Sequence, residues 1–198
     1  DLEKLKQNSV GVSHQSYEFN EHQYALAIDA AAPVAAYKPN HIENIPSTYE
    51  EVIKLAEKSK VILAIKPVDS ISYFNSIAAN IGCPINKNEG EFIDINNGIS
   101  VLRMMRKLAS LVPEDCLSMN PINVLDYMSM NEDKVYCPIL YGYSNYSRIG
   151  FRKSLIKFTN IPSFNDEKNN CKGSQIGGTG LALSSNSKFK EIAMDYAF

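Results

Sequence analysis

The chain has 198 residues, of which 44% are hydrophobic, so it can bury a core sufficient for one large domain or two small ones. It carries 20 Lys and Arg against 22 Asp and Glu, with no basic or acidic run, which argues against nucleic acid or an anionic membrane surface as its partner. No apolar run approaches the ~20 residues of a membrane span, and the charged first residues lack a signal peptide's apolar stretch.

The two ends suggest a piece of a longer protein. The chain begins with Asp1, and its last residues, "SNSKFKEIAMDYAF", keep apolar residues at helical spacing with no stop signal afterwards. The absence of a targeting signal from this sequence therefore says little about where the parent protein is located.

The first predicted elements are an extended segment and a helix. Residues 24–37 favour extended chain, and Pro33 indicates an edge strand or a crossing between units and not the middle of a sheet. The helix that follows begins near Ser47, because Ser47 and Glu50 have capping-box spacing ahead of a periodic apolar face.

The middle of the chain alternates between the two element types. Residues 60–68 form a continuous apolar run of strand length, typical of a strand covered on both faces. A helix is expected from Asp69, as its cap, to a stop at Gly82, and another over 98–112 with basic residues opposite its apolar face. Asn120 should cap a short helix whose first residue is Pro121.

The last part of the chain contains a tyrosine-rich segment, followed by two predicted strands with a loop between them. The stretch "YCPILYGYSNYS" (136–147) reads either as an aromatic surface for a ligand or as ordinary strand filler, because tyrosine is a good strand former whose hydroxyl needs a partner when buried. Strands are expected over 154–162 and 179–185, separated by a polar loop over 163–175. The alternation argues for an α/β sheet with helices on its faces.

Catalytic and metal-binding motifs are missing from the sequence. The four cysteines have no CxxC pair and no closely spaced His, so we expect buried thiols, with one disulfide left open: Cys83, Cys116, Cys137 and Cys171. The three histidines are expected at the surface, and "GGTG" (177–180) is expected to form a tight turn, although its backbone could also cradle an anion. No nucleophile motif or phosphate-binding loop is encoded, which disfavours an enzyme.

Five segments stand in an informative order: "YALAIDAAAPVAAYKPN", "IPSTYEEVIKLAEK", "ISYFNSIAANIG", "YCPILYGYSNYS" and "GGTGLALSSNSKFKEIAMDYA". Together they resemble the middle of a family 1 extracellular solute-binding protein, the maltose-binding type of ABC transporter component. The resemblance implies an α/β, periplasmic-binding-protein-like (type II) fold, mostly its second lobe plus crossover segments. It divides the chain into the end of the first lobe with the crossover strand (1–36), the second α/β lobe (37–145) and a return segment with strands and an unfinished helix (146–198).

The same resemblance implies a function. A solute, expected to be a saccharide, would be captured in an interlobe cleft and delivered to a membrane ABC permease, without turnover, cofactor, metal or nucleic acid. The full-length protein would be extracellular or periplasmic, as a membrane-anchored lipoprotein. The chain has no tryptophan, which favours a smaller solute than the oligosaccharides that such proteins stack on several tryptophans. An α/β enzyme or effector-sensing domain on a similar two-lobed layout is the alternative, and iron bound by tyrosine phenolates ranks behind a neutral solute.

The tyrosine segment carries the first group of implied ligand contacts. Tyr141 corresponds to the aromatic that stacks on the solute, because the apolar face of a sugar ring packs on a flat ring. Tyr143 would be the flanking aromatic, and Asn145 could donate and accept hydrogen bonds at the rim of the sugar.

The other implied contacts come from separate segments. Asp29 in the crossover is a hydroxyl acceptor, and Tyr37 stands where the chain enters the second lobe. Asp69 matches an acid at a helix start, although it could simply cap that helix, and Phe74 matches an aromatic that faces the cleft, although it also belongs to the helix's apolar stripe. Gly178, in the return strand, is assigned to the ligand site as well.

Overall fold

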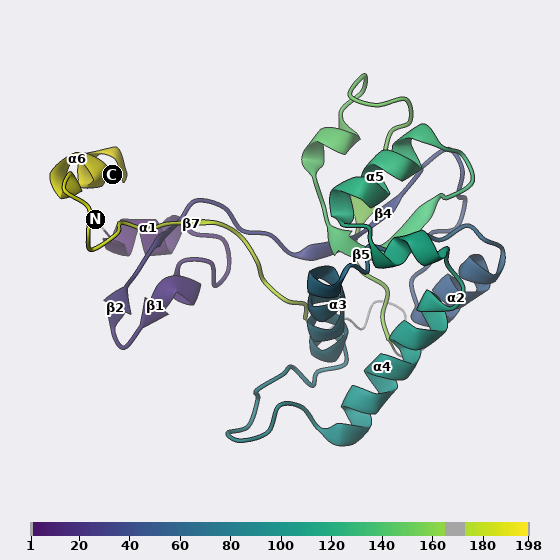
Figure 1. Cartoon of the computed structure of the whole chain (residues 1–198), viewed down its shortest axis with the longest axis horizontal. Coiled ribbons are helices and arrows are strands. Elements are labelled where there is room, and N and C mark those ends of the chain that lie inside the picture. The colour runs from purple at the N-terminus through teal and green to yellow at the C-terminus, as the bar shows by residue number, and fades with distance from the viewer. Residues whose placement is uncertain (1, 165–172, 198) are drawn as a thin grey trace. The chain divides into compact units, whose positions relative to one another are not determined.

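The computed structural model describes residues 2–164 and 173–197 and divides into two compact units (Figure 1). Unit 1 consists of Asp1–Ala32 and Ile176–Phe198, and unit 2 consists of Pro33–Gln175. The first boundary falls at Pro33, in the segment expected to cross between units. The expected return segment is divided, because its first part, up to Gln175, belongs to unit 2.

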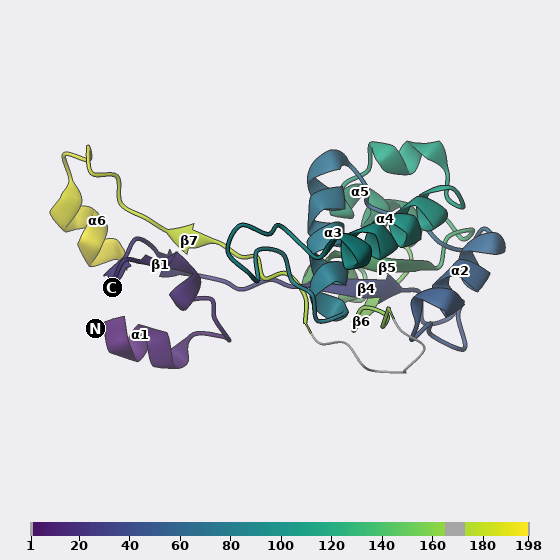
Figure 2. The same cartoon turned by 90° about the horizontal axis from the view of Figure 1, so that it is seen from below.

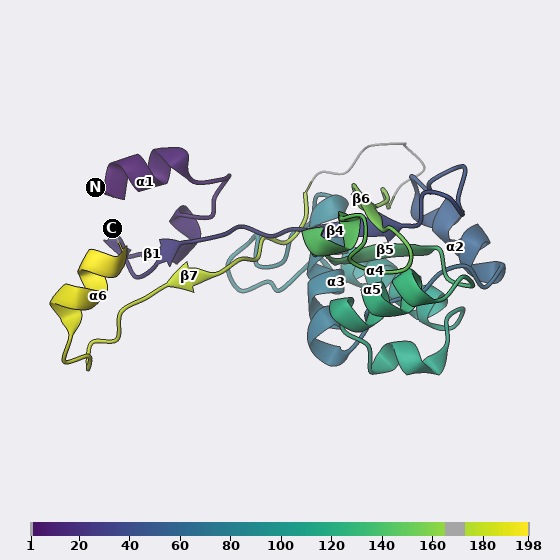
Figure 3. The same cartoon turned by 90° about the horizontal axis from the view of Figure 1, so that it is seen from above.

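Unit 2 is built on a three-stranded antiparallel sheet in the order β5-β4-β6. The strands are β4 (Pro33–Tyr37), β5 (Tyr136–Tyr141) and β6 (Lys157–Thr159), the last being shorter than the strand expected over 154–162. Figures 2 and 3 show helices α4 (Ile95–Ala109) and α5 (Pro121–Met130) on one side of β4, and strand β6 on its other side.

The sheet contains two prolines, each at a position where a strand tolerates proline. The prediction that the Pro33 segment avoids the middle of a sheet is wrong, because β4 is the central strand. Pro33 is tolerated there because it is the first residue of the strand and pairs with Tyr141 on one side only. The register shifts by one residue between Val34 and Ala36, opposite Pro138, so the second proline sits in a bulge of β5.

In the described part of unit 2, four α-helices and two 3-10 turns accompany the sheet. The helices are α2 (Tyr49–Glu57), α3 (Pro67–Asn80), α4 (Ile95–Ala109) and α5 (Pro121–Met130). The 3-10 turns are η2 (Glu114–Leu117) and η3 (Ser144–Ser147). All four helices lie where the sequence predicted them, within a few residues at the ends.

The helix caps differ in detail from the predicted ones. Helix α2 is capped by Thr48, whose side chain accepts from the backbone N–H of Glu51, one residue after the expected Ser47–Glu50 pair. Helix α3 begins earlier than expected, because Pro67 has the fixed φ that suits the first helical position, and Asp69 therefore lies in the first turn and does not cap. The Asn120 capping box of α5 is confirmed.

Residues 60–68 are predicted to form a buried strand. The central part of this segment is buried, but it forms little strand pairing with its neighbours. Its residues from Val61 to Ile65 belong to the core, and Val61 forms a single parallel bridge with Tyr136. The N–H of Ile62 also donates to the Tyr136 carbonyl of β5, at 3.0 Å, whereas Ile65 donates to the Cys116 carbonyl and Lys66 to the Met119 carbonyl.

Two tyrosines of the 136–147 segment belong to this core. Tyr136 is fully buried, with its hydroxyl donating to the Pro46 carbonyl at 3.3 Å, and Tyr146 is buried, with its hydroxyl donating to Asp126 at 2.7 Å. Both phenols therefore fill the interior of unit 2. For these two residues the structure favours a packing role over an aromatic surface for a ligand.

The cysteines in the described part of the chain are free thiols. Cys116 and Cys137 are buried and Cys83 is half-buried, while Cys171 lies outside the described residues. Burial raises the pKa of the Cys137 thiol to about 12, so this group is an inert part of the core.

Unit 1 consists of short elements. Its helices are α1 (Leu2–Asn8), the 3-10 turn η1 (Gln15–Tyr17) and α6 (Lys190–Ala197). Its strand pairs are β1 (Glu18–Phe19) with β2 (His22–Gln23), and β3 (Leu26–Ala27) with β7 (Gly180–Leu181). The strand expected over 179–185 is thus reduced to two residues.

The apolar side chains of unit 1 are at most half-buried in the part of the chain that the structure describes. No hydrophobic residue among the described residues of unit 1 belongs to the buried core, and an apolar hollow of about 680 Å³ lies among α1, β3, β7 and α6. His14 corrects the prediction of surface histidines, because it is 5% exposed beneath the Gln23 side chain, which donates to its carbonyl. None of the described helices combines the length and apolar character needed to cross a membrane.

Candidate functional site

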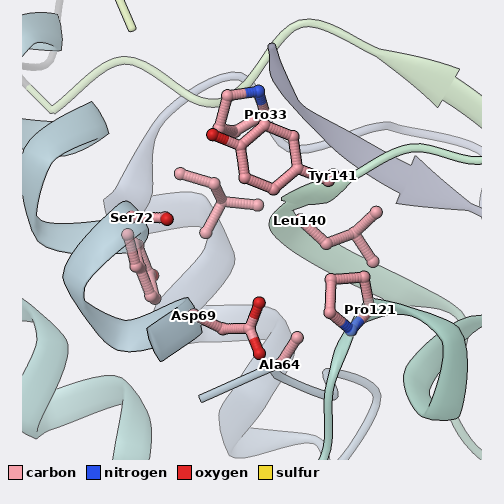
Figure 4. A pocket seen from close by; sticks show the side chains of 9 residues that line it. Pro33, Ala64, Asp69, Ser72, Pro121, Leu140 and Tyr141 are labelled. Atoms are coloured by element: carbon pink, nitrogen blue, oxygen red, sulfur yellow. The ribbon is translucent and has the colours of Figure 1, made fainter. Parts of the chain in front are cut away.

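A small hollow in unit 2 lies between α3 and the end of β5 (Figure 4). Its volume of about 10 Å³ is room for roughly one water molecule or one hydroxyl group. Asp69 and Ser72 project into it from α3 and Tyr141 from β5, and the strand pairing places Pro33 opposite Tyr141. We call it the Asp69 hollow; its lining residues are Pro33, Ala64, Asp69, Ser72, Tyr73, Pro121, Ile139, Leu140 and Tyr141.

Asp69 carries the unusual electrostatics of this hollow. Its Oδ2 atom is buried and has no hydrogen-bond partner among the described residues. Burial raises the pKa of the carboxyl, and the nearby charge of Lys66 opposes that rise. A buried carboxylate oxygen without a donor is costly, so the group is suited to accept a hydrogen bond from a ligand.

Tyr141 faces the same hollow and is half-buried. Burial raises the pKa of its phenol and the charge of Asp69 adds to the effect, whereas hydrogen bonding to Ser72 and Gln175 opposes it. The phenol is therefore a neutral donor and acceptor at ordinary pH, attached to a ring that is only partly covered.

Gln175 is held in place against α3 by two hydrogen bonds. The Asn75 amide donates to its Oε1 at 3.1 Å, and its backbone N–H donates to the Ser76 hydroxyl at 3.3 Å. These contacts fix a side-chain amide next to the Tyr141 hydroxyl.

The structure brings together Asp69 and Tyr141 but not the other predicted residues of unit 2. Tyr37 lies at the opposite end of β4 from Pro33, paired with Tyr136. Phe74 is half-buried and stacks on Phe92, with ring centroids 6.2 Å apart, so it does not line the Asp69 hollow.

Tyr143 and Asn145 lie beyond the end of β5, around the turn η3. Tyr143 precedes the turn and is 44% exposed, so its ring is open to solvent. Asn145 is exposed, and its Oδ1 accepts a long hydrogen bond of 3.4 Å from Arg148. Neither side chain lines the Asp69 hollow.

Close packing explains why a glycine stands at position 142, between the two tyrosines. A Cβ at this position would lie 2.8 Å from Cγ2 of Val34, closer than real side chains allow. Close packing against Val34 is therefore sufficient to explain this glycine.

Asp29 and Gly178 belong to unit 1, where they contact each other. The backbone N–H of Thr179 donates to the Asp29 carboxylate. Gly178 has φ of 142°, and a Cβ there would lie 2.6 Å from the Asp29 carbonyl oxygen, so glycine is required by close backbone approach. The predicted "GGTG" turn is wrong, because Gly177 pairs with Ala31 as extended chain.

Sequence reasoning missed several residues of the Asp69 hollow. Ser72 follows Asp69 at i+3, a spacing that places both on one helix face and could have identified it. Pro33 and Pro121 come from distant segments, and no local pattern connects them to Asp69. Gln175 is joined to α3 across about 100 residues, a contact that only the fold reveals.

The arrangement provides one hydrogen-bond acceptor, two hydroxyl groups and a partly exposed aromatic ring. These groups can hold a neutral, hydroxyl-bearing molecule by accepting from one hydroxyl and contacting its apolar surface. Among the described residues, no group of three or more His, Cys, Asp or Glu side chains is placed to hold a metal ion.

Comparisons with known proteins identify the fold. No family model matches the chain, and no curated protein does. Among solved structures, the maltose-bound MalE3 of T. maritima is 14% identical with a TM-score of 0.79, and the match covers 100% of this chain and 55% of that one. An ABC transporter solute-binding protein of Agrobacterium vitis S4 with bound D-mannitol is 15% identical with a TM-score of 0.76, covering 99% and 53%.

The chain thus spans about half the length of these similar structures. At these identities the likeness establishes the fold. The chain has the mixed α/β fold of the periplasmic solute-binding proteins, as the order of its sequence segments predicted.

Proposed function

We propose that the chain is part of a solute-binding protein that holds a small polyhydroxylated molecule, a saccharide or polyol, for uptake by an ABC importer. The observation that carries this proposal is the buried, unpartnered Oδ2 of Asp69 beside the half-buried Tyr141 ring. A hydroxyl group supplies the missing donor, and the C–H face of the same solute packs on the ring.

The size of the Asp69 hollow fits this assignment. At about 10 Å³ it admits a single hydroxyl and not a whole sugar ring. The rest of the solute would therefore lie outside it, over Tyr141. A hydroxyl is the natural occupant because it donates to Asp69 and accepts from Ser72 or Tyr141 at the same time.

The fold supports the same function class. The two similar structures described above were solved with maltose and with D-mannitol, a sugar and a polyol. The Agrobacterium vitis protein is a solute-binding protein of an ABC transporter, which favours capture without turnover. An ABC permease as partner and an extracellular or periplasmic site with a lipid anchor belong to this proposal.

The test is an NMR titration of the chain with a panel of sugars and polyols that includes maltose and D-mannitol, since spectra detect affinities as weak as millimolar. We expect at least one compound to shift the signals of Asp69 and Tyr141. Asp69→Asn should weaken that binding by about tenfold, the usual loss for one charge-assisted hydrogen bond. Asp115→Asn, which removes an exposed carboxylate from η2, is the matched control and should bind normally.

Two results would contradict the proposal. One is a panel in which no compound perturbs the residues of the Asp69 hollow. The other is steady release of reducing sugar from an oligosaccharide, which would indicate catalysis and favour the alternative of an α/β enzyme.

A further inference from the structure

A second hollow in unit 2 has a different chemical character. It has a volume of about 270 Å³ and is formed by the segment after β4 and by the loop between η3 and β6. We call it the basic hollow; its lining residues are Lys38, Pro39, Asn40, His41, Arg148, Ile149, Gly150, Arg152, Lys153, Ser154 and Leu155. This lining contains two lysines, two arginines and one histidine but no Asp or Glu.

Lys38 is the most confined of these cations. It is 1% exposed, and one of its three ammonium protons is donated to the Asn131 carbonyl at 2.8 Å. No carboxylate forms an ion pair with it within residues 2–164 and 173–197. Burial lowers the pKa of Lys38, the charge of Lys153 adds to this effect, and the nearby charges of Glu132 and Asp133 oppose it.

The three cations of the loop between η3 and β6 differ in how far nearby carboxylates already neutralise their charge. Arg152 is paired with Asp126 at 2.9 Å and lies over the Phe151 ring, and Lys153 reaches Glu132 only at 3.7 Å. Arg148 forms no ion pair in the described part of the chain, and its hydrogen bond to an exposed amide is long, at 3.4 Å. The excess positive charge of the hollow therefore resides on Lys38, Arg148 and the weakly paired Lys153.

The backbone brings these groups to one place. Gly150 has φ of 84°, and the N–H of Phe151 donates to the Arg148 carbonyl, so the chain reverses direction within the loop. As a result, Arg148 and Lys153 line the same hollow as Lys38, which is more than 100 residues earlier in the sequence.

We propose that the basic hollow binds a phosphate-class oxyanion, at a site separate from the Asp69 hollow. A tetrahedral oxyanion presents oxygens in several directions, which matches donors that come from the segment after β4 and from the loop. Arginine and lysine together are the usual partners of such groups, because guanidinium forks and ammonium groups both make strong, charge-assisted hydrogen bonds to them. The inference does not depend on the identity of the solute.

The oxyanion has two possible sources, inorganic phosphate and the phosphate of an anionic lipid headgroup. Ile149, at the tip of the loop, is 95% exposed, so an apolar side chain stands next to the basic hollow. Such a side chain would enter the interface of a membrane if the headgroup is the source, and it would have no role in binding free phosphate.

The test compares the chain with two double variants of equal charge. The first, Arg148→Gln with Lys153→Gln, removes two exposed cations of the basic hollow. The matched control, Arg103→Gln with Lys107→Gln, removes two exposed cations from α4. All four side chains are exposed, so both variants should keep the thermal midpoint of the parent chain.

One arm measures binding of inorganic phosphate by calorimetry at physiological ionic strength, and the other measures sedimentation with vesicles of phosphatidylcholine with and without phosphatidylglycerol. The first variant should bind about tenfold more weakly or worse in whichever arm shows binding, while the control should change less than about twofold. Binding in the phosphate arm identifies a free anion, and binding only to phosphatidylglycerol vesicles identifies a headgroup. Equal losses in the two variants, or no binding in either arm, would overturn the proposal.

Discussion

Asp69→Asn should stabilise the solute-free chain, although it weakens solute binding. The carboxylate has a buried oxygen without a partner among the described residues, and such a group costs about 1–3 kcal/mol. Because the side chain is only half-buried, solvent reduces this to about 0.5–1 kcal/mol. Asparagine has almost the same size and removes the charge, so that amount of stability should be regained.

The effect should depend on pH in a defined direction. Burial raises the folded-state pKa of Asp69 above its ordinary value, so between the two values the folded chain binds more protons than the unfolded chain. Stability is therefore lost as the pH rises through this window, and the loss is complete above the raised pKa. The stabilising effect of Asp69→Asn should be full above the raised pKa and absent below the ordinary Asp pKa of about 3.9.

Thermal unfolding followed by circular dichroism at neutral and acidic pH measures this difference. A chain of this size shifts its midpoint by about 2–4 °C per kcal/mol, so we expect a rise of about 1–4 °C at neutral pH. Asp115→Asn should leave the midpoint unchanged. A lower midpoint for Asp69→Asn at neutral pH would show that the carboxylate has a stabilising partner, and the reasoning about the Asp69 hollow would fail.

Three further predictions concern packing and local stability. Gly142→Ala places a Cβ 2.8 Å from the stiff side chain of Val34, so it should lower the unfolding free energy by about 1 kcal/mol or more in urea. Asn120→Ala removes the capping box with Asn123 and should cost about 1 kcal/mol; an unchanged urea midpoint would mean that the cap is redundant. Hydrogen exchange should be faster in unit 1 than in unit 2, because the described part of unit 1 contains no core hydrophobic residue; equal protection of β3 and β4 would contradict this.

The helices of unit 2 were largely predictable because their signals are local. The Asn120 cap and the apolar periodicity of 98–112 depend on residues within a few positions of one another. The strands were harder, since each is short and exists through a distant partner. Leu26 pairs with Leu181, for example: both segments were expected to be extended, but no local pattern showed that they pair with each other or that the pairing covers only two residues of each.

The roles of the tyrosines show a second limit. Tyr136 and Tyr146 are core residues because buried acceptors lie within reach, at Pro46 and at Asp126. No local pattern distinguishes them from Tyr141, which lines the Asp69 hollow. A prediction from sequence could therefore weigh both interpretations of the segment but could not assign each residue.

The basic hollow was invisible in the sequence for a related reason. The composition is nearly neutral and has no basic run, so it argued against an anionic partner. Lys38 and Arg148 lie in segments of ordinary charge, and the fold concentrates their charge in one place. Charge patterning along a chain reports only those clusters that are contiguous in sequence.

The two proposed sites lie at opposite ends of one strand, and this geometry predicts that they act independently. Pro33 begins β4 and lines the Asp69 hollow, whereas Lys38 directly follows β4 and lines the basic hollow. Five residues of extended chain separate them by about 17 Å. Because β4 is the central strand of the sheet, it is held on both sides and should not transmit a small change at one end.

Effects at sites so far apart, without shared partners, normally add. Asp69→Asn should therefore change solute binding equally in the parent chain and in the double variant Arg148→Gln with Lys153→Gln. Conversely, phosphate or vesicle binding should not respond to the presence of solute. NMR titration of the combined variant measures this directly, and a departure from additivity beyond about threefold would show that β4 couples the two hollows and that they are parts of one site.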